Sequence, residues 1–278
     1  MRTLIRLSLL FLPFTANSQN FHLTAFGGYA NYQGDLQDKR FTTKEAHAAF
    51  GGGLLYEFTE KIYLRANITV ATVSATDKSD TKNVGRNLSF SSPIRDIHLG
   101  LEYDLLNIYD KGFTPYLFAG ISYFHFDPSA IDSSGNKIYL QPLGTEGQGF
   151  YKDRKKYNLD QFAIPFGAGV KLAVGDNVRV GLEVGMRKTA TDYLDDVSST
   201  YADKNDLLLN NGPKAVEMAF RGDELKNGST YPAAGSQRGG AAKKDWYYFT
   251  GITLSWRIHK NESGSGRSSK LGCPSALY

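Results

Sequence analysis

Few groups of residues in this 278-residue chain have the types and spacing that catalysis requires. Ser122 and His125 could supply a nucleophile and a base, as in the hydroxyl chemistry of some lipid-modifying enzymes. In a strand, however, an interval of three residues places them on opposite faces, because side chains alternate. The histidines also lack the close spacing of metal ligands: His22, His47, His98, His125 and His259. The sequence therefore predicts no catalytic residues, and the expected protein is not an enzyme.

Three acidic residues near the middle of the C-terminal half, Asp192, Asp195 and Asp196, could bind calcium through their carboxylates. They lack the glycine-turned ligand spacing of a dedicated calcium site. A solvated acidic stretch or a helix cap is the expected role, so no metal and no cofactor are predicted. The single cysteine, Cys273, excludes an internal disulfide.

The elements that hold these residues are β-strands. In the segment Asn177–Arg187, the apolar residues Val178, Val180, Leu182, Val184 and Met186 alternate with polar residues and glycine. This period of two predicts a strand with one apolar and one polar face. In a soluble sandwich the apolar face would form the core, whereas in a membrane barrel it would face lipid.

The N-terminus has the features of a secretory signal peptide. Arg2 and Arg6 precede a short apolar run, and small residues follow at Ala16–Ser18. We expect residues 1–18 to be removed, which lowers the formal charge from +4 to +2. That charge is too small to indicate nucleic-acid binding. The chain lacks a run of about 18 apolar residues, so a transmembrane helix is excluded.

The same alternation recurs in eight segments, and the connections between them alternate in length. Short connections are expected at 59–61, 107–112 and 175–177, and long polar loops at about 31–44, 74–91, 127–160 and 189–244. Even strand numbers, short periplasmic turns and long extracellular loops are typical of outer-membrane barrels. We therefore predict an all-β fold, an eight-stranded antiparallel transmembrane β-barrel over residues 19–259, followed by a flexible tail at 260–278. The predicted strands are 21–30, 46–58, 62–73, 94–105, 115–126, 162–174, 177–187 and 246–258.

Details of two segments stay open at this point. The fifth strand is aromatic on both faces, so its phase is ambiguous. Within the longest loop, Lys214–Phe220 could be helical.

Aromatic residues cluster near both ends of the predicted strands, as in the interfacial girdles of membrane proteins. The set near the short turns is Phe21, Phe58, Tyr103 and Trp256, and the set near the long loops is Tyr29, Phe162, Trp246 and Tyr248.

The polar faces of the strands carry several charges, which would point into the barrel. An eight-stranded barrel is just wide enough for its own side chains to fill, and buried charges must be paired. We therefore expect a salt-bridge network in the lumen and no conducting pore, with Lys171 lying diagonally across a hairpin from Glu183. The predicted network comprises Arg65, His98, Glu102, Lys171, Arg179, Glu183 and Arg187.

Several loop and strand motifs resemble one family, the outer-membrane barrel component of the Bacteroidota type IX secretion and gliding machinery, often called PorG, with its uncharacterised relatives. The likeness covers most of the mature chain and includes the segments 27–28, 32–36, 86–90, 124–128, 140–149, 163–167, 186–189 and 191–197. Within these segments the residues that mark the loop motifs are Tyr32, Gly34, Asp35, Leu36, Pro142, Gly144, Thr145, Glu146, Gly147, Asp192 and Tyr193.

The resemblance implies an eight-stranded barrel associated with the periplasmic ring proteins of that secretion system. The expected function is a non-enzymatic anchor that contacts outer-membrane lipid and ring proteins, with no nucleic acid and no small-molecule substrate. A surface-binding barrel that adheres through its outer loops is the alternative, followed by a lipid-modifying enzyme. The loop motifs could either fold over the barrel mouth or bind a partner.

Overall fold

The computed structural model describes residues 21–37, 42, 44–79 and 83–258. The predicted signal peptide at 1–18 and the predicted tail at 260–278 lie outside the described residues.

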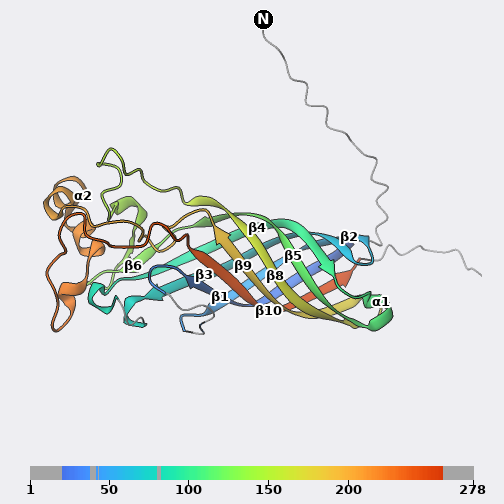
Figure 1. Cartoon of the computed structure of the whole chain (residues 1–278). Helices are drawn as coiled ribbons and strands as arrows, with labels where there is room; N and C mark the ends of the chain where they lie inside the picture. Colours follow the sequence, from blue (N-terminus) through green and yellow to red (C-terminus); the bar gives the residue numbers. More distant parts are fainter. Residues whose placement is uncertain (1–20, 38–41, 43, 80–82, 259–278) are drawn as a thin grey trace, which may run out of the picture.

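Eight long strands form a closed barrel (Figure 1). Each strand pairs antiparallel with its neighbour in the chain, and pairing of the first strand with the last closes the ring. The predicted eight-stranded antiparallel barrel is therefore confirmed. Its strands are β1 (Phe21–Gln33), β2 (His47–Thr59), β3 (Ile62–Thr76), β4 (Ser89–Asp104), β5 (Phe113–Phe126), β8 (Asp160–Val174), β9 (Val178–Thr189) and β10 (Trp246–Arg257).

The wall of the barrel has an apolar outside and a polar inside. Along β9, Leu182 is 67% exposed whereas the next residue, Glu183, is 5% exposed and faces the lumen. The same alternation resolves the ambiguous fifth strand: Leu117 and Ile121 are exposed, while Tyr116 and Phe118 are buried inside. A soluble sandwich would bury its apolar faces, so this distribution matches the membrane alternative.

The two ends of the barrel differ, as Figure 1 shows. At one end, here called the turn end, the strands are joined by residues 60–61, 105–112 and 175–177, with the short helix α1 (Ile108–Lys111) in the second connection. The other end, the loop end, carries the long connections and the helix α2 (Lys204–Ala219). In the part of the chain that the structure describes, none of the helices has both the length and the apolar character needed to span a bilayer.

The loop end contains more regular structure than the sequence predicts. β3 continues to Thr76 and β4 begins at Ser89, so the connection between them is shorter than the predicted 74–91 loop. A small hairpin, β6 (Ser129–Ile131) and β7 (Lys137–Tyr139), extends the sheet from β4. The remaining elements are the 3-10 turns η2 (Asp77–Ser79), η3 (Val84–Arg86), η4 (Gln141–Leu143) and η5 (Gly222–Glu224).

Helix α2 begins ten residues before the predicted start at Lys214. Asp203 caps it by accepting hydrogen bonds from the amides of Asn205 and Asp206. Gly212 has a φ of 80° and precedes Pro213, so the helix is kinked there. That kink explains why the sequence predicted only the second half.

The predicted girdle aromatics take different environments. Tyr29, Phe58, Tyr103, Phe162 and Trp256 are exposed on the outer wall, and Phe21 and Trp246 are half-buried. Tyr248 differs from the expectation, because it is only 7% exposed. Its hydroxyl accepts a hydrogen bond from the amide of Thr42.

Candidate functional site

The centre of the lumen is held by an ion pair between opposite walls. Arg65 of β3 and Glu183 of β9 lie four strands apart around an eight-stranded ring. Two hydrogen bonds of 2.6 and 2.8 Å join the guanidinium to the carboxylate, and Tyr116 donates a third bond of 2.8 Å to Glu183. The Arg65 guanidinium also lies 4.4 Å from the centre of the Phe118 ring. Such bidentate, charge-assisted pairs are the strongest kind of hydrogen-bonded contact in proteins.

A second ion-pair group lies nearer the turn end. Lys171 Nζ lies 2.6 Å from Glu102 Oε1 and 2.8 Å from Asp104 Oδ1. Lys171 lies diagonally across the β8–β9 hairpin from Glu183, as predicted, because the strand register pairs Gly169 with Glu183 and Lys171 with Gly181. Lys171 is therefore two residues closer to the turn end and pairs with the carboxylates of β4 instead.

A third group closes the turn end, around a carboxylate that the sequence analysis did not include. Glu57 is only 9% exposed and accepts hydrogen bonds from Tyr109 of α1 at 2.7 Å and from Arg257 at 2.9 Å. His22 Nε2 lies 3.1 Å from the same carboxylate, and Arg179 donates to the Tyr109 hydroxyl. Tyr56 and Phe58 belong to the outward face of β2, so strand alternation alone would have predicted that Glu57 faces the lumen.

Towards the loop end the lumen becomes more aromatic. Arg187 lies over the Phe249 ring at 4.7 Å, and its Nε lies 3.8 Å from Asp96 Oδ2. The same carboxylate accepts a 2.6 Å hydrogen bond from Tyr247. His98, which was expected in the charge network, instead packs against Phe118, with 5.8 Å between ring centres. Its ring nitrogens have no hydrogen-bond partner among the described residues.

Charge is balanced inside the described barrel, because five basic and five acidic side chains face the lumen. A cavity in the middle of the lumen, lined by Arg65, Glu102 and Glu183, has a volume of only about 30 Å³, close to that of one water molecule. The lumen is therefore a packed polar core. The basic members are Arg65, Lys171, Arg179, Arg187 and Arg257, and the acidic members are Glu57, Asp96, Glu102, Asp104 and Glu183.

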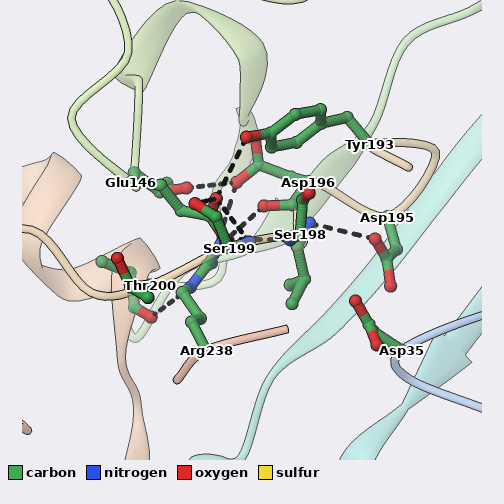
Figure 2. A network of polar contacts seen from close by, with 12 residues as sticks. Asp35, Glu146, Tyr193, Asp195, Asp196, Ser198, Ser199, Thr200 and Arg238 are labelled. Atoms are coloured by element: carbon green, nitrogen blue, oxygen red, sulfur yellow. Dashed lines mark hydrogen bonds and ion pairs between the residues drawn. The ribbon is translucent and has the colours of Figure 1, made fainter. Parts of the chain in front are cut away.

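The loop end is closed by a polar cluster with Glu146 at its centre (Figure 2). One oxygen of this fully buried carboxylate accepts from the amide of Ser198 at 2.9 Å and from Arg238 at 3.0 Å. The other accepts from the amide and hydroxyl of Ser199 at 3.0 and 2.6 Å, and from Tyr193 at 3.2 Å. Glu146 therefore fastens the 140–149 loop onto the 191–199 loop. We call this loop assembly the cap.

Asp196 supports the same junction. Its carboxylate accepts hydrogen bonds of 2.6 Å from Thr145 and 2.7 Å from Tyr157. The residue has a φ of +65°, which aspartate tolerates better than most side chains. Burial raises the pKa of Asp196 to about 6, and the nearby Arg238 acts in the opposite direction.

A third part of the cap joins β1 to the loops. Tyr32 Oη lies 2.6 Å from Asp195 Oδ2 and 3.1 Å from Asp245 Oδ1. Burial raises the pKa of both carboxyl groups well above its usual value. Gly34 lies beside them, and a Cβ there would fall about 2 Å from the Tyr32 hydroxyl and from Asp245. A larger residue at that position would therefore displace the side chains of Tyr32 and Asp245.

The remaining motif residues also lie in the cap. Asp35 accepts from the amide of Gly240, and Arg86 donates to the Asp35 carbonyl oxygen and to both carboxylate oxygens of Asp77. Asp192 accepts from Ser198 at 2.7 Å, and burial raises its pKa to about 7. Leu36 is 2% exposed in the adjoining apolar core. Pro142 lies in the first turn of η4, and Gly144 and Gly147 have positive φ values of 54° and 90°.

The structure therefore brings together loop motifs that are far apart in the sequence. Each contributes hydrogen bonds or buried side chains to one cap, as expected if the motifs fold over the barrel mouth. Among the described residues, no group of three histidine, cysteine, aspartate or glutamate side chains is arranged to hold a metal ion.

Ser122 and His125 lie on opposite sides of the wall. Ser122 is 2% exposed in the lumen, whereas the His125 side chain is partly exposed outside, with its Nδ1 2.9 Å from Asp160 Oδ1. The two residues therefore cannot act together as a nucleophile and its base.

Comparison with known families gives one assignment. A family described as a domain of unknown function, DUF6089, matches residues 1–212. The chain belongs to this family. No curated protein matches its sequence.

Three solved structures similar to this family member are bacterial barrels, each aligned over 86% of this chain. Neisserial surface protein A shares 10% identity, with a TM-score of 0.42 over 97% of its own chain. Ail, the attachment invasion locus protein of Yersinia pestis, shares 8% identity, with a TM-score of 0.40 over 97% of its chain. The outer-membrane protein OprG from Pseudomonas aeruginosa shares 13% identity, with a TM-score of 0.40 over 98% of its chain.

Proposed function

We propose that this chain is a non-enzymatic barrel of the bacterial outer membrane that anchors periplasmic proteins of a type IX secretion apparatus. The observation that carries the proposal is the filled lumen, crossed by the Arg65–Glu183 pair and left with a cavity of about 30 Å³. A barrel whose lumen is filled conducts no solute, so it contacts other molecules through its two ends or its outer wall.

The membrane location rests on the outer wall. Large apolar side chains such as Leu182 and Ile121 are more than 60% exposed around the barrel. Exposed apolar surface of this extent is stable only against lipid or a protein partner, and an apolar band is the lipid-facing feature of outer-membrane barrels. In such barrels the short turns are periplasmic, which supports a periplasmic location for the turn end.

The partner proposal rests on the resemblance to the PorG-type barrels. Among the described residues, a periplasmic partner would reach only those of the turn end. Specific interfaces usually bury about 1,200–2,000 Å² in total, more than one short turn offers. The connections 60–61, 105–112 and 175–177 would therefore act together, with Tyr109 of α1, which is 43% exposed, as a central contact.

Deletion of the gene in its own host tests this function. We expect type IX cargo to accumulate inside the cell envelope, and plasmid-borne wild-type protein to restore its release. The combined change Asp110→Ala and Lys111→Ala, at two exposed positions of α1, should fail to restore release while the barrel still folds. Normal cargo release in the deletion strain would contradict the proposal.

A surface-binding function is the second candidate, and one feature of the loop end favours it. Leu209 on α2 is 83% exposed and its neighbour Leu208 is 44% exposed. Two exposed leucines on a rigid loop helix suit contact with an external partner. Normal cargo release with loss of cell attachment in the deletion strain would support this function. Normal release with altered lipid A would support a lipid-modifying enzyme.

A further inference from the structure

A large groove lies on the outside of the barrel at the loop end. Its volume is about 1460 Å³. It is lined by the loop-end part of β8–β10, by the segment 237–244 that leads into β10, and by residues of 33–35 and 83–86. The wall contributes apolar and aromatic side chains, and the segment contributes basic ones. The lining residues that matter here are Phe166, Met186, Lys188, Lys243, Lys244 and Trp246.

The basic residues of this groove are available to an anion. Lys188, Lys243 and Lys244 are exposed, and within residues 21–37, 42, 44–79 and 83–258 no ion pair involves any of them. Two other basic residues of the lining, Arg86 and Arg238, are already paired with buried carboxylates. The arginines therefore stabilise the cap, whereas the three lysines form no ion pair with any residue that the structure describes.

Acidic residues near the groove do not cancel this charge. Asp35 lines it, but one of its carboxylate oxygens accepts from the amide of Gly240. Asp192 lies within electrostatic range of Lys244 and is bonded to Ser198 in the cap. Three lysines against one lining carboxylate leave the groove positive.

The lining of the groove combines aromatic and basic side chains, as is typical of the membrane surface. Lys188 Nζ is 5.7 Å from the Trp246 ring, whose other neighbour is Phe166, with 5.9 Å between ring centres. Tryptophan beside lysine is characteristic of the interface between acyl chains and head groups. Towards the barrel centre the same strands present Val184 and Ile252 on the outside, both exposed and apolar. A ligand in the groove can therefore be charged at one end and apolar at the other.

We propose that this groove binds the phosphate-bearing head group of an outer-leaflet glycolipid, whose acyl chains lie along the wall of β8–β10. The lysine ammonium groups bind the phosphate, and Trp246 and Phe166 pack against the sugar and the first methylenes. The inference rests on the proposed outer-membrane location and adds a lipid ligand to it.

The test uses the full-length mature barrel, refolded in detergent, with phosphorylated lipid A as the probe and native mass spectrometry as the readout. The variant carries Lys188→Gln, Lys243→Gln and Lys244→Gln. The matched control carries Lys152→Gln, Lys155→Gln and Lys204→Gln, which removes the same charge from exposed loop positions. We expect the first variant to bind lipid A about tenfold or more weakly than wild type, and the control to bind as wild type.

Two further probes identify the ligand chemistry. Lipid A without phosphate should bind wild-type protein as weakly as phosphorylated lipid A binds the triple variant. Inorganic phosphate at the same concentration should not displace the lipid, because it lacks the apolar part. Equal binding by wild type and variant, equal binding of the dephosphorylated lipid, or displacement by free phosphate would each overturn the proposal.

Folding is checked separately by the heat-modifiable mobility of the barrel on gels, and location by membrane fractionation of the host. A folded barrel in the outer membrane that fails to bind lipid A overturns this inference alone. A protein absent from the outer-membrane fraction overturns the proposed function as well.

Discussion

Arg65 and Glu183 form a bidentate ion pair that joins opposite walls of the barrel, 118 residues apart in the sequence. The backbone hydrogen bonds of the sheet join each strand only to its two neighbours. The Arg65–Glu183 pair instead joins two strands on opposite sides of the lumen. Removing one member leaves the other charge buried, which typically costs about 3–5 kcal/mol. Arg65 Nη1 also lies 3.3 Å from Glu102, so Glu102 partly compensates the charge of Arg65 when Glu183 is removed. The expected loss in the free energy of unfolding is therefore about 3 kcal/mol.

Glu183→Gln should therefore lower the urea midpoint of the refolded barrel, followed by tryptophan fluorescence. Glu224→Gln is the matched control, because Glu224 forms an exposed pair with Arg221. Glu57 would be a poor control, since it belongs to the lumen group at the turn end. Equal midpoints for the two variants would contradict the structural role of the lumen network.

Leu182 tests which face of the wall meets lipid. It is 67% exposed in the middle of β9, where an arginine facing the bilayer centre costs about 2–4 kcal/mol. Leu182→Arg should reduce the folded, heat-modifiable fraction in lipid, whereas Leu182→Ala should leave most of it. Tolerance of arginine equal to that of alanine would show that this face is not in contact with lipid.

The barrel could be predicted from the sequence because the two-residue period of each strand is a local pattern, which is visible without knowing which strands pair. Leu182 outward and Glu183 inward follow from alternation along β9 alone, and the filled lumen follows from the number of strands. The ion pairs inside the lumen also join strands that are not neighbours in the sheet, and alternation does not define those contacts. Lys171 lies diagonally across the hairpin from Glu183 as predicted, but its ammonium pairs with Glu102 and Asp104 of β4.

The cap was less predictable. The 31–36 and 141–149 segments had the composition of ordered turns, but Glu146 meets Ser198, Ser199 and Arg238 only after the barrel has brought the loops together. Sequence spacing carries no signal for such contacts. Arg238, the basic partner in the cap, lies within the longest loop, where no periodic pattern distinguishes it.

Glu146 should stabilise the cap but have little effect on the stability of the barrel. Glu146→Gln removes the charge from the buried pair with Arg238 and weakens its bonds to the serine amides, and hydrogen bonds to charged groups contribute about 1.5–3 kcal/mol. Trypsin cleavage within the loops, at sites such as Arg154 and Lys204, should accelerate roughly tenfold or more. The heat-modifiable band should persist. Cleavage as slow as in Glu224→Gln would contradict the assignment of Glu146 as the centre of the cap.

Asp192 should make the cap pH-dependent. Its folded pKa of about 7 lies above the unfolded value of about 3.9, so the folded state binds a proton that the unfolded state has lost. The stability of the cap should therefore fall as the pH rises from about 4 to about 7, and then level off. Asp196, with a pKa raised to about 6, acts in the same direction.

Hydrogen exchange of the amides in 191–199, corrected for intrinsic rates, measures this effect. Asp192→Asn can still accept from Ser198 but cannot ionise, so its loss of protection between pH 5 and pH 8 should be smaller than in wild type. Asp153→Asn, at an exposed position, should behave as wild type. A loss of protection in Asp192→Asn as large as in wild type would exclude Asp192 as the titrating group.

The proposed anchor function is tested most directly by site-specific photocrosslinking in the native host. A photoreactive amino acid is placed at Asp110, exposed on α1 at the turn end, or at Leu209, exposed on α2 at the loop end. The proposed function predicts crosslinks from position 110 to periplasmic ring proteins and none of comparable yield from position 209. Crosslinks from position 209 to an external protein, with none from position 110, would contradict it.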